Sequence, residues 1–412
     1  MNQIKNIIEN VKQEIRPKES EKLRIDKIIT KISEKIEKST KKLKIESKLT
    51  LGGSIAKGTW LSEPEDIDFF MKFDKKYEKE DISNICLEIC KDAFKKVEVL
   101  HGSRDYFNIH LNKYKIEIVP VLEINEPKEA KNSMDISPFH VLYVKTKIDK
   151  NKSLADEIRI MKKFCQACNC YGAETYLHGF SGYAIELLII HYGSFLKLIN
   201  SFEKMQPKII IDTEKFYKTK EEIINKLSDA KKKSPIILID PVLPIRNACA
   251  SLSYESFSRF LFHARMFLRN PSKDFFKKIE FGKEQLKRRS KIRGTKILFF
   301  NVKRGNLNEE TFLAILRKKI KSIKSRIESE GFNVYDADII KENQKIIVFF
   351  EIETIKVSKM KRHFGPPVWV RRKNFDEFIR KWKNVYVYEN RLAIDRKRTY
   401  KSVKDIIQPL LS

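Results

Sequence analysis

Long apolar runs are missing from this chain of 412 residues. No stretch of 18 apolar residues occurs, so we expect no transmembrane helix. The N-terminal segment, Met-Asn-Gln-Ile-Lys-Asn-Ile-Ile-Glu, has no apolar core of the kind that signal peptides carry. We therefore expect a cytoplasmic protein that does not bind membranes.

Cysteine is scarce, with six residues in the whole chain. Thiols stay reduced inside cells, so disulfides are not expected. Cys165, Cys168 and Cys170 have the spacing of half a zinc site, but no second cluster of cysteine or histidine at the usual spacing completes it. Burial in a helix is therefore favoured over metal binding.

Acidic residues are in deficit, with 55 Asp and Glu against 84 Lys and Arg and a formal net charge of +29. So large an excess indicates a polyanionic partner, of which nucleic acid is the obvious one. A lysine-rich proteome encoded by an AT-rich genome is the alternative explanation. Nucleic acid is favoured because aromatic residues accompany the basic ones in the C-terminal third.

No internal repeat is present, and the length alone predicts two to four domains. Hydrophobic periodicity predicts an α+β fold in three parts: an α+β unit, a helical part and a second α+β unit. Helices are expected at 4–40 with a break at Pro17, and at 81–94, 155–168, 182–198, 256–268, 309–330 and 375–383. Strands are expected at 106–111, 114–121, 296–302 and 345–355, a polar surface excursion at 204–234, and a break at Gly365-Pro366-Pro367.

The most informative segment, residues 51–70, joins a Gly52-Gly53-Ser54 turn to the pair Asp66 and Asp68. Glycines let a backbone approach a ligand closely, and the free N–H groups of a turn that begins a helix suit phosphate. Residues two apart on a strand face the same side, so the two carboxylates point together. Such a pair beside such a turn suits divalent metal ions and a nucleoside triphosphate.

A third acid, Glu117, is expected on a neighbouring strand, on the side opposite to two isoleucines. An acid on so apolar a strand is costly unless it is paired or binds a metal. A solvent-facing glutamate on an edge strand is the alternative, but the presence of Asp66 and Asp68 favours the metal. The three acids would hold two Mg²⁺ ions about 4 Å apart, which predicts nucleotidyl transfer onto a hydroxyl.

With these residues in place, the sequence resembles the archaeal-type (class I) CCA-adding enzymes, tRNA nucleotidyltransferases of the polymerase-β superfamily. The glycine turn and the Asp-x-Asp pair are common to the superfamily, whereas several other runs resemble the archaeal enzymes in order and spacing. These runs are Ile136-Ser137-Pro138-Phe139-His140, Tyr171-Gly172-Ala173-Glu174, Gly179-Phe180-Ser181-Gly182-Tyr183, Glu186-Leu187-Leu188, Tyr192-Gly193-Ser194-Phe195, and Asp240-Pro241-Val242 followed by Arg246-Asn247.

The resemblance implies a palm-like catalytic nucleotidyltransferase domain at 1–145, a helical central domain at 146–275 that completes the nucleotide pocket, and a C-terminal tRNA-binding domain at 276–412. It implies that the catalytic, metal-binding acids are Asp66, Asp68 and Glu117. It also implies that the nucleotide is contacted by Gly53, Ser54, Lys57, Ser137, His140, Lys162, Tyr171 and Arg246, the last of which helps to read the base.

Three of these positions depart from the family's pattern. Glu117 stands where the third acid is usually Asp, and its extra methylene would shift a metal by up to about 1 Å. Lys57 stands where Arg is expected, so a bidentate fork becomes a point charge. Ser137 replaces Thr and keeps the hydroxyl.

Taken singly, each remaining nucleotide residue has a simpler interpretation. His140 suits a core histidine, Lys162 a solvated helix face, Tyr171 a helix cap and Arg246 an ordinary loop. Their joint occurrence at the family's spacing favours the nucleotide site.

The C-terminal third carries the expected RNA-binding residues Lys318, Lys319, Arg371 and Arg372. The first two belong to a basic helix whose apolar residues Ile315, Leu316 and Ile320 are expected to be buried, and a solvated face is the alternative. The two arginines, together with Arg362 and His363, flank Trp369, which suits phosphate contacts and stacking on exposed bases or sugars.

The sequence therefore predicts an enzyme that builds or repairs the 3′-terminal CCA of tRNA, using CTP, ATP and Mg²⁺ and contacting the acceptor and T arms. A CC-adding enzyme, a poly(A) or oligo(U) polymerase, and a non-catalytic tRNA-binding protein are the alternatives. The oligomeric state is open, and a homodimer is among the arrangements that the sequence allows.

Overall fold

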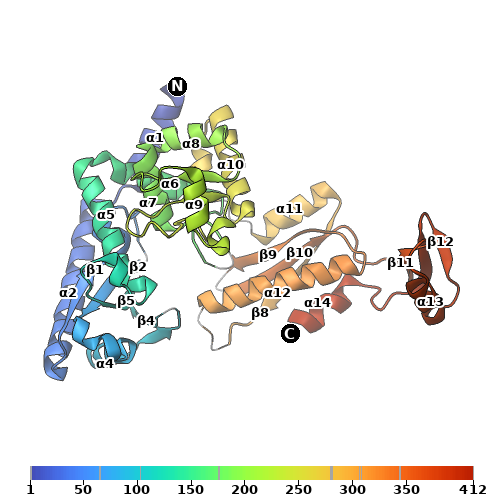
Figure 1. Cartoon of the computed structure of the whole chain (residues 1–412), viewed down its shortest axis with the longest axis horizontal. Coiled ribbons are helices and arrows are strands. Elements are labelled where there is room, and N and C mark those ends of the chain that lie inside the picture. The colour runs from blue at the N-terminus through green and yellow to red at the C-terminus, as the bar shows by residue number, and fades with distance from the viewer. Residues whose placement is uncertain are drawn as a thin grey trace. The chain divides into compact units, whose positions relative to one another are not determined.

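The computed structural model describes residues 2–411 except 65, 103, 175–176, 279–281, 306, 308 and 343–344. Glu65, inside the segment that joins the glycine turn to the two aspartates, thus lies outside the described residues. The chain divides into two compact units, Met1–Ile279 and Glu280–Ser412, whose elements are labelled in Figure 1. The predicted α+β class is confirmed, and each unit is described by itself.

A five-stranded mixed sheet forms the first part of the first unit. Its strands are β1 (Ser47–Leu51), β2 (Asp66–Phe73), β3 (Glu98–Leu100), β4 (Tyr106–Leu111) and β5 (Tyr114–Leu122). The spatial order is β1-β2-β5-β4-β3, and only the central pair β2–β5 is parallel. The two strands that carry the predicted acids are therefore adjacent.

Two long helices cover one face of this sheet. The helices are α2 (Glu19–Leu43) and α4 (Ile82–Ala93), and Asp81 caps the second by accepting hydrogen bonds from two backbone N–H groups. Ile67 and Phe69 of β2 are buried against them, together with alternate residues of β5. Because side chains alternate along a strand, Asp66 and Asp68 face the other side.

The other face packs beneath α5 (Ser137–Lys150), where Phe70 and Val119 lie in a small apolar cluster. An ion pair fixes the start of this helix. Buried Asp135 pairs with Arg104 and also accepts a hydrogen bond from Leu122 N at 2.9 Å, at the end of β5. Ser137 and His140 are thereby held beside the acid-bearing strands.

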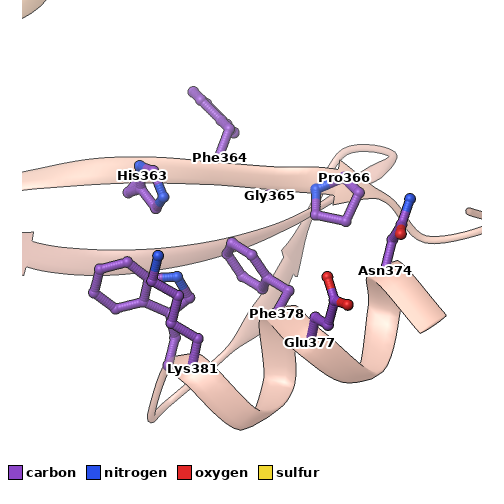
Figure 2. A pocket seen from close by; sticks show the side chains of 9 residues that line it. His363, Phe364, Gly365, Pro366, Asn374, Glu377, Phe378 and Lys381 are labelled. Atoms are coloured by element: carbon purple, nitrogen blue, oxygen red, sulfur yellow. The ribbon is translucent and has the colours of Figure 1, made fainter. Parts of the chain in front are cut away.

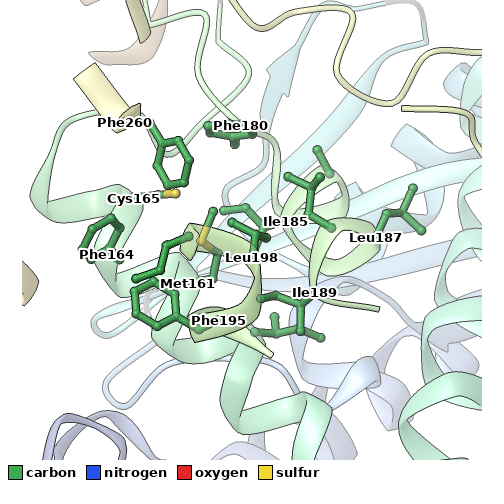
Figure 3. Packing of buried hydrophobic residues seen from close by; sticks show 14 of the residues in the cluster. Met161, Phe164, Cys165, Phe180, Ile185, Leu187, Ile189, Phe195, Leu198 and Phe260 are labelled. Carbon is green, nitrogen blue, oxygen red and sulfur yellow. The ribbon is translucent and has the colours of Figure 1, made fainter. Parts of the chain in front are cut away.

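The second part of the first unit is helical and has an aromatic core. Its main helices are α1 (Asn2–Ile15), α6 (Ser153–Ala167), α7 (Gly182–Tyr192), α8 (Phe195–Glu203) and α10 (Tyr254–Arg269). Figure 3 shows Phe164, Phe195 and Phe260 among the buried side chains, and the first two rings lie 5.0 Å apart. Cys165 and Cys170 are also buried in this core, but only Cys165 lies in a helix as predicted, because α6 ends at Ala167 and Cys168 is partly exposed.

The prediction of one helix over 182–198 is wrong. Gly193 adopts φ +79 and ends α7, and the Ser194 hydroxyl then caps α8. Glycine takes this left-handed conformation without steric cost, so the sequence Tyr-Gly-Ser-Phe marks a helix boundary. Among the described residues no single helix is long and apolar enough to cross a membrane, and α7 and α8 meet that criterion only as a pair bent by 89°.

The polar segment 204–234 is more than a surface excursion. It contains β6 (Ile209–Ile211) and α9 (Lys220–Lys226), and β6 pairs in parallel with β7 (Ile236–Leu238). The ends of β6 are buried, so the segment contributes to the core. Phe276, placed by sequence at the start of the C-terminal domain, packs in the same helical core.

The second unit contains two small sheets. Its elements are α11 (Lys283–Arg293), β8 (Lys296–Val302), α12 (Glu309–Ser329), β9 (Val334–Glu342), β10 (Lys345–Ile352), β11 (Met360–Pro367), α13 (Arg372–Lys381), β12 (Tyr386–Tyr388), β13 (Arg391–Lys397) and α14 (Val403–Leu411). The orders are β8-β10-β9 and β11-β13-β12. Strand β9 and helix α14 were not predicted. The predicted break at Gly365-Pro366-Pro367 does not end the strand, since β11 runs through it, but the pairing of β11 with β13 is irregular there, with a register shift between Phe364 and Pro367.

Candidate active site

The glycine turn is closed against the acid-bearing strand. Gly52 N donates to Asp68 O at 2.8 Å, and Gly53 begins the short helix α3 (Gly53–Lys57) with φ +57. A Cβ added at Gly53 would lie 1.6 Å from Asp68 Oδ2. Glycine is therefore required at position 53 by space as well as by backbone conformation.

The three predicted acids lie on one face at the same end of β2 and β5. In the parallel register Asp68 is opposite Glu117, and Asp66 is opposite Lys115. Lys115 Nζ lies 3.4 Å from Asp66 Oδ1 and 3.9 Å from Glu117 Oε2. An ammonium group thus stands between two of the acids.

This arrangement bears on metal binding. No three His, Cys, Asp or Glu side chains within the described ranges are already grouped as a metal site. The donor set nevertheless suits a hard divalent cation, since it consists of carboxylate oxygens on one sheet face. Burial, and then the negative charge of Asp66, raises the pKa of Asp68, while the ammonium groups of Lys57, Lys115 and Lys162 act in the opposite direction. An acid crowded in this way is stabilised by added positive charge.

Two predicted nucleotide residues meet at a buried carboxylate, Glu186 of α7. Glu186 accepts hydrogen bonds from Lys57 Nζ at 2.6 Å and from Thr59 Oγ1 at 2.7 Å, and Lys162 Nζ lies 3.4 Å away. Lys162 also donates to Thr59 O at 3.1 Å. We call Lys57, Thr59, Lys162 and Glu186 the Glu186 cluster. Its members come from α3, the following loop, α6 and α7.

Burial and the neighbouring charges act in opposite directions on the pKa values in the Glu186 cluster, and the outcome differs between Lys162 and Glu186. Burial lowers the pKa of Lys162 to about 8, despite the opposing charge of Glu186. Burial would raise the pKa of Glu186 itself, but the two lysines more than offset it and lower that pKa. The cluster carries two cations and one anion, so a further negative charge is favourable there. Lys162 is buried, so it does not lie on the solvated helix face that was the simpler interpretation of its position in the sequence.

Two further nucleotide candidates, His140 and Arg246, meet at a second buried carboxylate, Asp240. Arg246 Nη1 donates to Asp240 Oδ2 at 2.5 Å, and the Tyr183 hydroxyl donates to Oδ1 at 2.9 Å. His140 Nε2 lies 3.0 Å from Oδ2, and its ring stacks on that of Tyr183 with centroids 4.1 Å apart. We call His140, Tyr183, Asp240 and Arg246 the Asp240 cluster.

The Asp240 cluster holds a charged arginine at the protein surface. Burial would raise the pKa of Asp240, but His140, Arg246 and the Val242 N–H lower it to about 2. Burial lowers the pKa of His140, against the effect of Asp240. Arg246 is anchored through Nη1 to Asp240 and lies over the Tyr183 ring, and its side chain keeps 39% of its surface exposed. Such a group can bond the polar edge of a base.

The remaining nucleotide candidates are placed by the backbone. Ser54 lies in α3 and Ser137 opens α5, and both are half-buried. Tyr171 forms an isolated bridge with Phe180, and a Cβ at Gly182 would lie 3.4 Å from its hydroxyl. Burial, and then the charge of Glu186, raises the pKa of Tyr171, so the phenol stays protonated.

The RNA candidates lie in the second unit. Lys318 is exposed and Lys319 half-buried on α12, whose Leu316 and Ile320 are buried as expected. The prediction for Ile315 is wrong, because 51% of it is exposed. Arg371 and Arg372 begin α13 and are exposed.

Sequence reasoning gave no role to Thr59, Tyr183, Glu186 or Asp240. Three of them stand inside motif runs that had been noted. Glu186 could have been identified from the sequence, since an acid within Ala-Ile-Glu-Leu-Leu-Ile-Ile is costly unless it is paired. Asp240 gives a weaker signal, because an Asp-Pro pair is common in turns.

Three family descriptions match consecutive parts of the chain. "Nucleotidyltransferase domain" matches residues 9–140, "tRNA nucleotidyltransferase, second domain" matches 156–277, and "CCA-adding enzyme, C-terminal domain" matches 293–412. The first match contains all three predicted acids.

Curated relatives are similar along most of the chain. A CCA-adding enzyme of Nanoarchaeum equitans is 38% identical over 357 residues, covering 86% of this chain and 85% of its own. One from Pyrococcus abyssi is 32% identical over 375 residues, covering 88% and 80%. One from Methanocaldococcus jannaschii is 29% identical over 420 residues, covering 99% and 91%.

Solved structures are similar in fold at low sequence identity. A cytoplasmic RNA terminal U-transferase superposes with a TM-score of 0.54 at 12% identity, covering 68% of this chain and 100% of its own. A structure of Cid1, described as having RNA terminal uridylyl transferase activity, gives 0.55 at 11% identity, covering 69% and 100%. At these identities the likeness concerns the fold alone.

Proposed function

This chain belongs to the CCA-adding enzyme family, and we propose that the acid-bearing end of its five-stranded sheet is the single site at which C and then A are transferred to the 3′ end of tRNA. The chain is a tRNA nucleotidyltransferase, and its product is the 3′-terminal CCA. The observation that supports the site is the register of β2 and β5, which sets Asp68 opposite Glu117 with the glycine turn closed on Asp68.

Nucleotidyltransferases of this family generally use divalent metal ions. We propose that the ions are two Mg²⁺ and that Asp66, Asp68 and Glu117 hold them. When bound, such ions activate the attacking 3′ hydroxyl and neutralise charge on the phosphates. Because Gly53 has no side chain, the Asp68 carboxylate can occupy the space beside it and face the site.

The substrates are tRNA and nucleoside triphosphates. We propose that Gly53, Ser54, Lys57 and Lys162 bind the triphosphate, because the two lysines give the Glu186 cluster an excess of positive charge. Ser137, His140 and Tyr171 are proposed to contact phosphate and ribose. Arg246, anchored by Asp240, is proposed to read the Watson–Crick edge of C and A.

We propose that the second unit binds the acceptor and T arms through Lys318, Lys319, Arg371 and Arg372. Trp369 is 74% exposed just before α13, where a large aromatic side chain can stack on RNA. The same unit has a surface pocket of about 390 Å³, and His363, Phe378 and Lys381 are among the lining side chains shown in Figure 2. Aromatic and basic groups in one hollow suit an unpaired base or a sugar–phosphate turn.

The alternative outputs are separable by one assay. The purified protein is given tRNA lacking one, two or three 3′ nucleotides, with CTP, ATP, GTP and UTP separately and together, and the 3′ ends are sequenced. Complete CCA supports the proposal, and CC, oligo(A) or oligo(U) ends contradict it. No addition would indicate a protein that only binds RNA. Homodimer formation and a cytoplasmic location stay predictions from the sequence.

A further inference from the structure

Glu186 is a charged group with none of its surface accessible. It accepts two hydrogen bonds from the sheet side of the first unit, from Lys57 and Thr59, which lie more than 120 residues before it in the chain. It also faces Lys162 of α6. A buried carboxylate with three donors is strongly oriented, and removing it leaves two cations uncompensated.

We propose that Glu186 is a positioning residue that holds Lys57 and Lys162 in register for the triphosphate and so couples the sheet to the helical part. This inference rests on the proposed function. The two lysines alone would repel each other and turn towards solvent. Glu186 between them neutralises one of the two charges, so the Glu186 cluster keeps a net positive charge that attracts a phosphate.

The backbone that follows α3, at Gly58 and Trp60, is held by a side chain of α6. Arg159 of α6 donates to Trp60 O at 2.8 Å and to Gly58 O at 2.5 Å. Helix α6 therefore holds the backbone after α3, while Glu186 of α7 holds its side chains. Binding of a triphosphate at Lys57 would therefore affect the positions of both α6 and α7.

The charges around Lys162 make this role measurable through pH. Burial, Lys57 and Arg159 lower the pKa of Lys162, whereas Glu186 raises it. Asp68 also interacts with Lys162, and Tyr171 interacts with Glu186 and Asp68. Lys162 is cationic below about pH 8 and neutral above it. Triphosphate binding should therefore weaken as the pH rises through about 8. Without the Glu186 charge, this loss should begin at lower pH.

The experiment measures KM and kcat for CTP addition, and CTP binding without RNA, between about pH 6.5 and 9.5. Glu186→Gln should raise KM roughly tenfold or more with kcat changed less than about threefold. The pH at which KM begins to rise should fall by about one unit, since an opposite charge this close shifts a pKa by about 1–3 units. Glu186→Asp keeps the charge, so it should keep the pH midpoint and raise KM severalfold.

Glu351 supplies a matched control. It is fully buried in the second unit and accepts from Thr295 Oγ1 at 2.7 Å and from two arginines, so its chemistry resembles that of Glu186. Glu351→Gln should lower thermal stability but leave the KM for CTP and its pH midpoint as in wild type.

The outcomes separate this inference from the proposed function. If Glu186→Gln loses stability as Glu351→Gln does while KM and the pH midpoint stay unchanged, Glu186 is only structural and the inference is wrong. If Glu186→Gln does not fold, a wild-type KM in Glu186→Asp contradicts the inference equally. A wild-type protein that binds CTP but adds none would contradict the proposed function, and the binding data would still decide the role of Glu186.

Discussion

Lys115 Nζ lies 3.4 Å from Asp66 Oδ1, so a cation of the chain itself contacts the acids proposed to bind metal. Its position opposite Asp66 follows from the parallel register of β2 and β5. Metal ions and this ammonium group compete for the same negative charge.

Lys115→Met should tighten binding of Mn²⁺, used as a spectroscopic substitute for Mg²⁺. A unit charge about 4 Å away at a partly exposed site is worth enough to change affinity by roughly tenfold. Electron paramagnetic resonance of free Mn²⁺ measures the affinity without turnover. Lys113→Met, at an exposed position in the preceding turn, is the control. Unchanged or weaker binding in Lys115→Met would mean that the ammonium supports the acids and does not compete.

Asp68→Ala should abolish addition of both C and A while tRNA affinity stays within a few fold. Removing a metal ligand loses several kcal/mol of transition-state stabilisation, which corresponds to a rate lower by roughly 10³-fold or more. Single-turnover addition to tRNA ending in each of the three precursor ends gives the rates. Retained C addition with loss of A alone would contradict a single shared site.

Glu117 tests whether the site has adapted to its longer acid. Glu117→Asp should reduce activity if the site fits glutamate, because the shorter side chain retracts the carboxylate by one methylene. Glu117→Gln should be far worse, since a ligand must be anionic to neutralise a metal. Comparing the two variants by initial rate separates geometry from charge. Gln as active as Glu would remove Glu117 from the proposed metal site.

Arg246→Ala should weaken selection of CTP and ATP over GTP and UTP more than it slows transfer. Arg246→Lys keeps a charge beside Asp240 but loses the planar fork, so it should lose selectivity as well. Competition among the four nucleotides, read by sequencing 3′ ends, gives the ratios. A uniformly lower rate with wild-type ratios would assign Arg246 to phosphate.

Binding of tRNA should weaken steeply with salt, since each phosphate contact releases counterions. Replacing Lys318, Lys319 and Arg371 with Ala should lower the slope of log affinity against log salt by roughly 0.7–0.9 for each contact removed. Filter binding at several salt concentrations measures it. The triple variant of Lys27, Lys31 and Lys38, exposed on α2, removes the same charge as a control. Equal slopes in both would favour genome composition as the source of the net charge.

The positions of the acids could be predicted because strand periodicity is strict. Once β2 and β5 were expected, the common face of Asp66 and Asp68 and the outward side of Glu117 followed from alternation alone. Family resemblance then supplied the identity of the nucleotide residues. Neither source gave their partners, since Lys57 meets Glu186 only when segments 129 residues apart pack together.

Local signals misled the prediction at two places for different reasons. The apolar pattern of residues 182–198 predicted one helix that runs through Gly193. In the structure this glycine ends one helix, and the serine after it caps the next. Pro366 and Pro367 were expected to break the chain, but β11 is an edge strand that continues through them with only a local register shift, because a missing N–H costs little at a sheet edge. Strand position in a sheet is a tertiary property that local composition does not reveal.

The two N-terminal helices have a consequence for any attempt to isolate the catalytic part. Helix α2 covers the sheet, but Val11 and Ile15 of α1 are buried in the helical core that is completed more than 250 residues later. Helix α1 therefore links the sheet part of the first unit to its helical part, which two different family descriptions match. A fragment ending near residue 140 would display an apolar helix with nothing to receive it, and it should associate with itself or with the missing helical part supplied in trans.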